Sequence, residues 1–87
     1  MEFMLGTAAN VSQLGLARQC EDLGYTHLGI GEGPLLFSEP YEYLALAARD
    51  TRHIQLGTWV TNPLTRLFPQ TANAIATLNA LAPGRVF

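Results

Sequence analysis

The 87-residue sequence has few charged residues, a single cysteine, and no long basic or apolar run. Five Lys and Arg stand against seven Asp and Glu, so the net charge is −2. The weak acidity and the lack of a basic run argue against a nucleic-acid-binding protein. No apolar stretch approaches the roughly 20 residues that cross a bilayer, so no membrane association is expected. The single cysteine, Cys20, excludes a disulfide framework and a cysteine zinc site, and we expect no metal.

The N-terminus Met1-Glu2-Phe3 lacks the basic start of a signal peptide, and a cytoplasmic location is the simplest expectation. Hydrophobic residues make up 48% of the chain and charged residues 14%, against roughly 25% charged in ordinary soluble domains. This mix excludes a disordered chain. It also leaves too much apolar sequence for a chain so small, which normally buries about 60–65% of its unfolded surface. We therefore expect a homo-oligomer or a part of a longer protein.

Apolar runs alternate with helical patterns along the whole chain. Strands are predicted at residues 3–7, 27–30 and 54–61, and residues 85–87 look like the start of a fourth strand. Helices are predicted between them, the first capped by Asn10 and ended by Gly24, the second opened by Ser38 and Pro40, and the third opened by Pro69 and ended by Pro83-Gly84. The expected buried helix positions are Leu16, Cys20 and Leu23, then Leu44, Ala47, Ala48 and Thr51, then Ile75, Leu78 and Leu81.

The spacing between strands, about 25–30 residues, is typical of one βα unit. Three such units and the start of a fourth strand predict an α/β fold with a parallel sheet, and residues 1–87 contain no linker or second domain. A parallel barrel needs eight strands and a doubly wound sheet usually has five or six, so the predicted sheet is open. Half of a flavodoxin-like sheet is disfavoured because no phosphate-binding loop follows the first strand.

Functional residues in parallel α/β folds lie at the carboxyl ends of the strands, which here means residues 7–10, 31–38 and 59–69. The G-x-G-x-G run at residues 29–33 is not a dinucleotide-binding loop, because the spacing differs and Pro34 follows. Glu32 is either a hydrogen-bonding partner of a ligand or a solvated loop carboxylate. Trp59 either fills the interior of the fold or forms a wall for a flat ring. Arg66 either meets a phosphate or forms a surface salt bridge.

Several segments of the sequence resemble the luciferase-like monooxygenase superfamily. The segments that carry the resemblance are Leu16-Ala17 with Glu21 and Leu23-Gly24-Tyr25, Ala47-Ala48 with Thr51 and Ile54, Leu56-Gly57-Thr58-Trp59-Val60-Thr61-Asn62-Pro63, Arg66, Ala76-Thr77-Leu78, and Ala82-Pro83-Gly84-Arg85. The Thr61-Asn62-Pro63 segment is most similar to the coenzyme F-420-dependent branch, which includes methylenetetrahydromethanopterin reductase. The resemblance covers nearly the whole chain.

The resemblance implies the N-terminal part of a (βα)8 TIM barrel and a cofactor at its carboxyl-terminal face. The implied cofactor is coenzyme F-420, with FMN as the alternative. The implied activity is that of an oxidoreductase that transfers hydride to, or activates oxygen on, a small organic substrate. Because the later loops of such a barrel are absent from this sequence, we expect the chain to be inactive alone. The alternative is a truncated, non-catalytic paralogue that binds a cofactor or assembles with itself.

The resemblance also points to the cofactor-binding residues Glu32, Trp59, Val60, Thr61 and Asn62. It further implies a non-proline cis peptide bond between Trp59 and Val60. One position departs from the family pattern, because Gly33 stands where many members have a histidine after an acidic residue. The acid or base role of that histidine is therefore not carried over, and the catalytic residues remain unknown.

Overall fold

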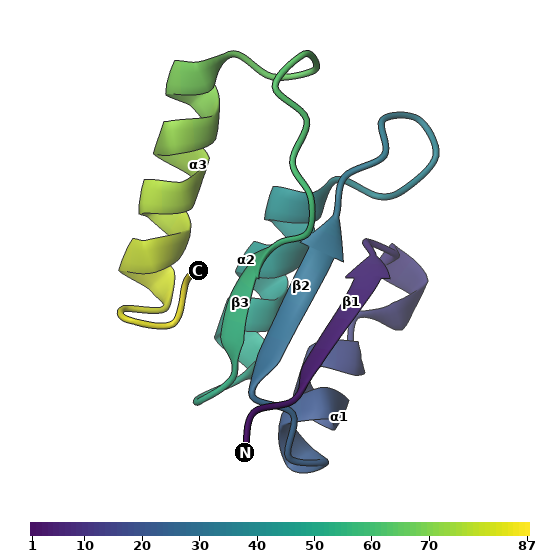
Figure 1. Ribbon diagram of the computed structural model, residues 1–87, viewed down its shortest axis with the longest axis vertical. Helices are drawn as coiled ribbons and strands as arrows, with labels where there is room; N and C mark the ends of the chain where they lie inside the picture. Colours follow the sequence, from purple (N-terminus) through teal and green to yellow (C-terminus); the bar gives the residue numbers. More distant parts are fainter.

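The computed structural model describes all 87 residues as three strands that alternate with helices (Figure 1). The elements are β1 (Met4–Ala8), the 3-10 helix η1 (Val11–Gln13), α1 (Leu16–Asp22), β2 (His27–Gly31), α2 (Pro40–Asp50), β3 (Gln55–Thr58) and α3 (Phe68–Leu81). The sheet has the order β1-β2-β3, and both strand pairs are parallel. The predicted α/β class with a parallel sheet is confirmed. None of the helices combines the length and apolar character needed to cross a bilayer.

The last three residues begin a fourth strand beside β3, as predicted. Val86 forms a parallel bridge to Leu56. The backbone nitrogen of Leu56 donates to the carbonyl of Arg85 at 2.7 Å, and the nitrogen of Phe87 donates to the carbonyl of Leu56 at 3.0 Å. The C-terminal end of the chain therefore continues the strand order of the sheet.

The two faces of the sheet differ in their cover. Leu28, Ile30 and Leu56 point to the face that α1 and α2 cover, where they are fully buried. They form one core with Leu44 of α2 and Cys20 of α1. The opposite face, turned to the viewer in Figure 1, has no helix over it. Because side chains alternate along a strand, every second residue of β1, β2 and β3 belongs to this open face.

Helical periodicity predicts the buried face of α2 correctly and those of α1 and α3 only in part. All four expected positions of the α2 segment are buried, and the hydroxyl of Thr51 donates to the carbonyl of Ala47. Leu23 is 73% exposed because α1 ends before it. Ile75 and Leu81 are also exposed, and only Leu78 of α3 is buried. Most of α3 stays exposed because the helix lies at the edge of the sheet and packs mainly against α2.

Two predicted helix starts shift because polar side chains take other partners. Asn10 accepts from the nitrogen of Ser12 and caps only the 3-10 turn, so α1 starts later, after Gly15. Glu39, not Ser38, is the N-cap of α2. The hydroxyl of Ser38 instead accepts from the nitrogen of Val11 at 3.1 Å.

The third strand ends at Thr58, three residues before the predicted end. Thr61 and the backbone of Asn62 bond to the side chain of Glu32 instead of a strand, which ends the regular pairing. The expected helix-ending glycines are confirmed, since Gly24 and Gly84 have φ of 93° and 75°. Positive φ carries little penalty for glycine.

At the amino-terminal end of β3, the carboxylate of Glu21 closes the turn that follows α2. It accepts hydrogen bonds from the backbone nitrogens of Arg52, His53 and Ile54, the last two at 2.6 and 2.9 Å. Burial by itself raises the pKa of this carboxyl, but the three backbone donors outweigh burial and hold the pKa below its usual value. Glu21 thus satisfies three backbone groups that have no partner in a helix or strand.

Arg85 donates hydrogen bonds to carbonyl groups of the same turn. Its guanidinium donates to the carbonyls of Ala48, Thr51 and Ile54 at 3.0, 3.2 and 3.2 Å, and to the hydroxyl of Thr51 at 2.9 Å. The last carbonyls of a helix lack intrahelical partners, and a positive charge there is favourable. Arg85 therefore ties the start of the fourth strand to the end of α2.

Candidate functional site

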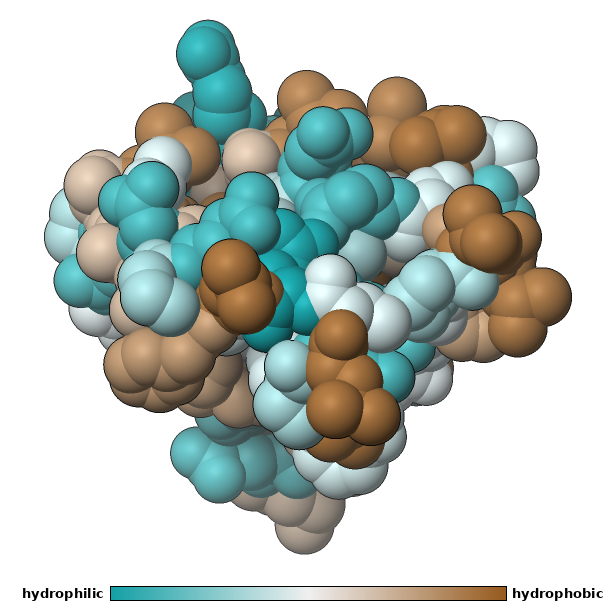
Figure 2. Space-filling view, turned by 90° about the horizontal axis from the view of Figure 1, so that it is seen from above, coloured by the Kyte–Doolittle hydropathy of each residue, from teal (hydrophilic) through white to brown (hydrophobic).

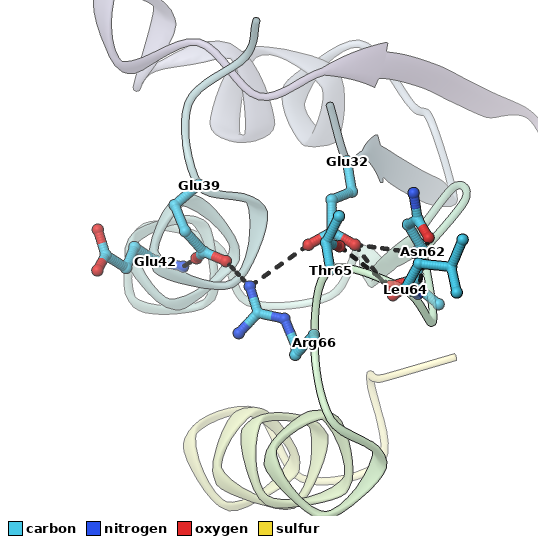
Figure 3. A network of polar contacts seen from close by, with 8 residues as sticks. Glu32, Glu39, Glu42, Asn62, Leu64, Thr65 and Arg66 are labelled. Atoms are coloured by element: carbon cyan, nitrogen blue, oxygen red, sulfur yellow. Dashed lines mark hydrogen bonds and ion pairs between the residues drawn. The ribbon is translucent and has the colours of Figure 1, made fainter. Parts of the chain in front are cut away.

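The candidate site lies at the carboxyl ends of β2 and β3, where the chain leaves the sheet in two loops. Glu32 follows β2 directly, and Thr61 and Asn62 follow β3. One carboxylate oxygen of Glu32 accepts from the backbone nitrogen of Asn62 at 2.8 Å and from the hydroxyl of Thr61 at 3.3 Å (Figure 3). The structure thus brings together three of the five residues that the sequence singled out.

Arg66 joins this group from the loop before α3. Its Nη2 donates to the second oxygen of Glu32 at 3.4 Å and also to the carboxylate of Glu39 (Figure 3). The guanidinium lies over the ring of Tyr41, with its central carbon 4.6 Å from the ring centre. We call Glu32, Glu39, Thr61, Asn62 and Arg66 the Glu32–Arg66 cluster.

The burial of this cluster removes one of the two interpretations that the sequence left open for Glu32 and for Arg66. The side chain of Glu32 is 6% exposed, so it is not a solvated loop carboxylate. The side chain of Arg66 is 17% exposed and forms a partly buried bridge between two carboxylates, which differs from a surface salt bridge. Burial alone lowers the pKa of Arg66, but the charges and hydrogen bonds of Glu39 and Glu32 raise it overall, so the guanidinium stays charged.

Asn62 has a different position from the rest of the cluster. Its side-chain oxygen accepts from the nitrogen of Leu64 at 2.9 Å, which forms a local turn. In Figure 3 no contact joins the amide nitrogen of Asn62 to Glu32 or Arg66. Asn62 therefore presents two hydrogen-bond donors that the cluster does not use.

Trp59 lies over a part of the open sheet face that has no side chains of its own. Gly6, Gly29 and Gly57 are register partners on the three strands and form one row. A Cβ atom on Gly29 would lie 2.8 Å from the Cβ of Trp59, and one on Gly6 would lie 3.3 Å from Cδ1 of the indole. Trp59 is nevertheless 56% exposed, so one part of the indole stays free. We call Gly6, Gly29 and Gly57 the glycine row.

Val60 is exposed, and its carbonyl accepts from the backbone nitrogen of Glu32 at 3.2 Å. The peptide bond between Trp59 and Val60 is cis, as the family resemblance implied. All five predicted site residues thus lie on two adjoining segments, 32 and 59–62.

Sequence reasoning missed the glycine row, Glu39 and Tyr41. The glycines carry a signal that was not used, because each lies inside a predicted strand and a parallel register places them side by side. Glu39 and Tyr41 had no such signal, since their roles depend on Arg66 crossing from a loop 27 residues away.

Figure 2 shows the end of the molecule where the loops gather, with a hydrophilic centre and hydrophobic groups around it. A cavity of about 250 Å³ lies between the loops, and its lining includes Glu32, Leu35, Phe37, Glu39 and Arg66. Exposed apolar residues of the two loops are Leu35, Leu36, Val60, Leu64 and Leu67.

The residues present fit a flat ring ligand. The glycine row lets the side chains of Trp59 and Phe87 lie directly on the sheet, the indole of Trp59 keeps an exposed part, and Asn62 offers unused amide donors. Ligand pockets of this kind combine apolar walls with a few placed polar groups. Gly33 supplies no acid or base, so these residues suit the binding and orientation of a ring.

Comparisons with known proteins agree with this geometry. The family model described as luciferase-like monooxygenase matches residues 5–87. A 5,10-methylenetetrahydromethanopterin reductase from Methanolobus tindarius is 47% identical over 45 residues, which are 52% of this chain and 14% of that protein. The structure of the coenzyme F-420 dependent tetrahydromethanopterin reductase from Methanopyrus kandleri superposes with a TM-score of 0.88 at 29% identity.

That superposition covers 99% of this chain and 25% of the Methanopyrus protein. The chain therefore spans a quarter or less of the length of the relatives that it matches. Its three parallel strands correspond to part of the TIM barrel that the sequence implied. A family match over residues 5–87, on a fold with this likeness, leads to one conclusion: the chain belongs to the luciferase-like monooxygenase family.

Proposed function

We propose that the chain forms the N-terminal part of a coenzyme F-420-dependent oxidoreductase that acts on a small organic substrate. The observation that carries the proposal is the exposed indole of Trp59 beside the unused amide of Asn62, at the carboxyl end of β3, in a chain that superposes on an F-420-dependent reductase with a TM-score of 0.88. Bound F-420 supplies two-electron hydride transfer at its ring, and bound FMN supplies the same transfer and reaction with oxygen.

The residues of this chain would bind and orient the ring. Trp59 forms an aromatic wall and excludes water from one side. Asn62 donates hydrogen bonds to ring oxygens or nitrogens through its free amide. Glu32 holds Thr61 and the backbone of Asn62 in place. The backbone of Val60 lies between these two contacts and lines the ring edge.

The test is a titration of the 87-residue chain with F-420 and, separately, with FMN. Native mass spectrometry reports the bound cofactor and the assembly state together, and the single tryptophan gives a fluorescence signal next to the proposed site. We expect saturable F-420 binding that quenches Trp59. Preferential binding of FMN would identify FMN, and not F-420, as the cofactor. If neither cofactor binds, the proposal is contradicted.

A second candidate function follows from the open sheet. The outer edge of β1 has no strand partner, and Met4, Trp59 and Phe87 are exposed on the uncovered side. Unpaired edges and exposed apolar surface favour association. The chain would then be a self-assembling protein without catalysis. Sedimentation at micromolar concentration should show a dimer or a larger species, and a monodisperse monomer would remove this candidate.

A further inference from the structure

We propose that Arg66 is a positioning residue of the candidate site. It holds Glu32 in place, and through Glu32 the segment of Trp59, Thr61 and Asn62, without touching the ligand itself. The ligand part of this inference rests on the proposed function, whereas the positioning part can be tested on the chain alone.

The geometry of the bridge supports a positioning role. One nitrogen, Nη2, joins Arg66 to both Glu32 and Glu39. Glu39 is fixed because its other carboxylate oxygen accepts from the nitrogen of Glu42 at 2.8 Å and caps α2. Arg66 therefore connects a helix that is anchored in the core to a carboxylate that holds the loop after β3.

The stacking of Arg66 on Tyr41 adds a second anchor. Tyr41 is a buried residue of α2, and the guanidinium lies 4.6 Å from its ring centre. A cation over an aromatic face is attractive, and the attraction grows as water is removed. Apart from Glu32, the guanidinium therefore contacts Glu39 and Tyr41, and both belong to the amino-terminal end of α2.

The charges argue against a phosphate at Arg66. Two carboxylates, Glu32 and Glu39, surround one guanidinium, so the cluster carries an excess of negative charge. An anionic ligand group would be repelled by the same carboxylates that hold Arg66. A neutral ring beside Trp59 and Asn62 meets no such repulsion.

The first test compares two ligands, F-420 and its phosphate-free deazariboflavin fragment. For Arg66→Met we expect the affinity for both to fall by a similar factor, about tenfold or more, because the loop loses its support. Arg66→Lys should restore most of the affinity, since one amine can replace the single bridging nitrogen. A loss confined to F-420 would mean that Arg66 contacts the phosphate and would overturn the proposal.

The second test needs no ligand. Trp59 is the only tryptophan and lies on the segment that Arg66 is proposed to hold. In Arg66→Met, the emission of Trp59 should shift to the red and its quenching by acrylamide should increase, while Arg66→Lys stays close to the parent chain. Arg18→Met is the control, because Arg18 forms an exposed pair with Asp50 on the opposite part of the molecule.

Circular dichroism establishes that each variant is folded before these measurements. If Arg66→Met does not fold, Glu39→Gln weakens the same bridge with a smaller change and takes its place. An unchanged Trp59 signal in a folded variant would contradict the positioning role. If no chain binds ligand but the signal responds to Arg66, the proposed function fails and the positioning role stands.

Discussion

The two ends of β3 are each held by a glutamate and an arginine, in different ways. At the amino-terminal end, Glu21 binds backbone nitrogens and Arg85 binds backbone carbonyls together with one side chain, the hydroxyl of Thr51; the two residues do not bind each other. At the carboxyl-terminal end, Glu32 and Arg66 bind each other, and their remaining partners include side chains. In both pairs, the hydrogen bonds join residues that are distant in the sequence and lie next to β3 in the fold.

We infer from this difference that one end of β3 contributes mainly to stability and the other mainly to ligand binding. In a parallel barrel, the amino-terminal face is the place of structural contacts and the carboxyl-terminal face is the place of active sites. Bonds to the backbone fix a turn whatever side chains the turn carries. Bonds between side chains fix the side chains, and these are what a ligand meets. The first pair should therefore govern unfolding, and the second pair should govern binding.

The largest effect on stability is expected at Glu21. Glu21→Ala leaves the nitrogens of Arg52, His53 and Ile54 without their charged acceptor, and the free energy of unfolding should fall by about 2–3 kcal/mol. Urea unfolding measures the change. The control is Asp22→Ala on the same helix, which should change the value by no more than about 0.5 kcal/mol. Equal effects of the two substitutions would remove the special role of Glu21.

Arg85→Met should have the next largest effect, about 1–2 kcal/mol in the free energy of unfolding. It removes the donors to the carbonyls of Ala48, Thr51 and Ile54 while keeping a side chain of similar length. Trp59 emission should not change, because Trp59 lies at the other end of β3. A shift of that emission would show that the two ends are coupled and would weaken the comparison.

Asn62→Ala should act on binding and not on stability. Loss of the amide donors should weaken the affinity for F-420 by about 1 kcal/mol, while the free energy of unfolding changes by no more than about 0.5 kcal/mol. Fluorescence titration and urea unfolding of the same samples give the two values. Unchanged affinity in both Asn62→Ala and Glu32→Gln would exclude this segment as the cofactor site.

The smallest expected effect is a dependence on acid pH. Burial opposes the charged form of Glu21, but the backbone donors outweigh burial and lower the pKa of Glu21 in the folded chain below its usual value. Its contribution to stability is therefore complete above the pKa of the unfolded chain and is lost as the pH falls through the folded value. Urea unfolding measured at several pH values from about 6 down to about 3 should show a free energy of unfolding that falls less steeply with pH in Glu21→Gln than in the parent chain.

The elements that could be predicted from the sequence are those with local causes. The buried positions of α2 follow from helical spacing, and the turns at Gly24 and Gly84 follow from the conformational freedom of glycine. Leu23 and Leu81 were misplaced, because spacing alone does not tell where a helix ends or how far a neighbour covers it.

The parts that could not be predicted depend on contacts between distant residues. Glu21 meets residues 31–33 positions away, and Arg85 meets carbonyls 31–37 positions away. All their partners except the hydroxyl of Thr51 are backbone groups, which every residue carries and which the sequence therefore does not distinguish. The candidate site could be predicted in part. Its residues follow predicted strands, which gives their place, but the pairing of Glu32 with Arg66 is visible only in the folded structure.

The glycine row has a consequence for engineering this protein. Replacing glycine by alanine in a strand is a common way to raise stability, since glycine costs roughly 0.5–1 kcal/mol there. At Gly57 the added methyl group would lie 2.5 Å from the carbonyl oxygen of Phe87, and at Gly29 it would displace Trp59. At Gly15, outside the sheet, the added carbon meets nothing within 4 Å. A thermostable variant should therefore be sought at Gly15, because the three positions of the glycine row are already in contact with the side chains of Trp59, Met4 and Phe87.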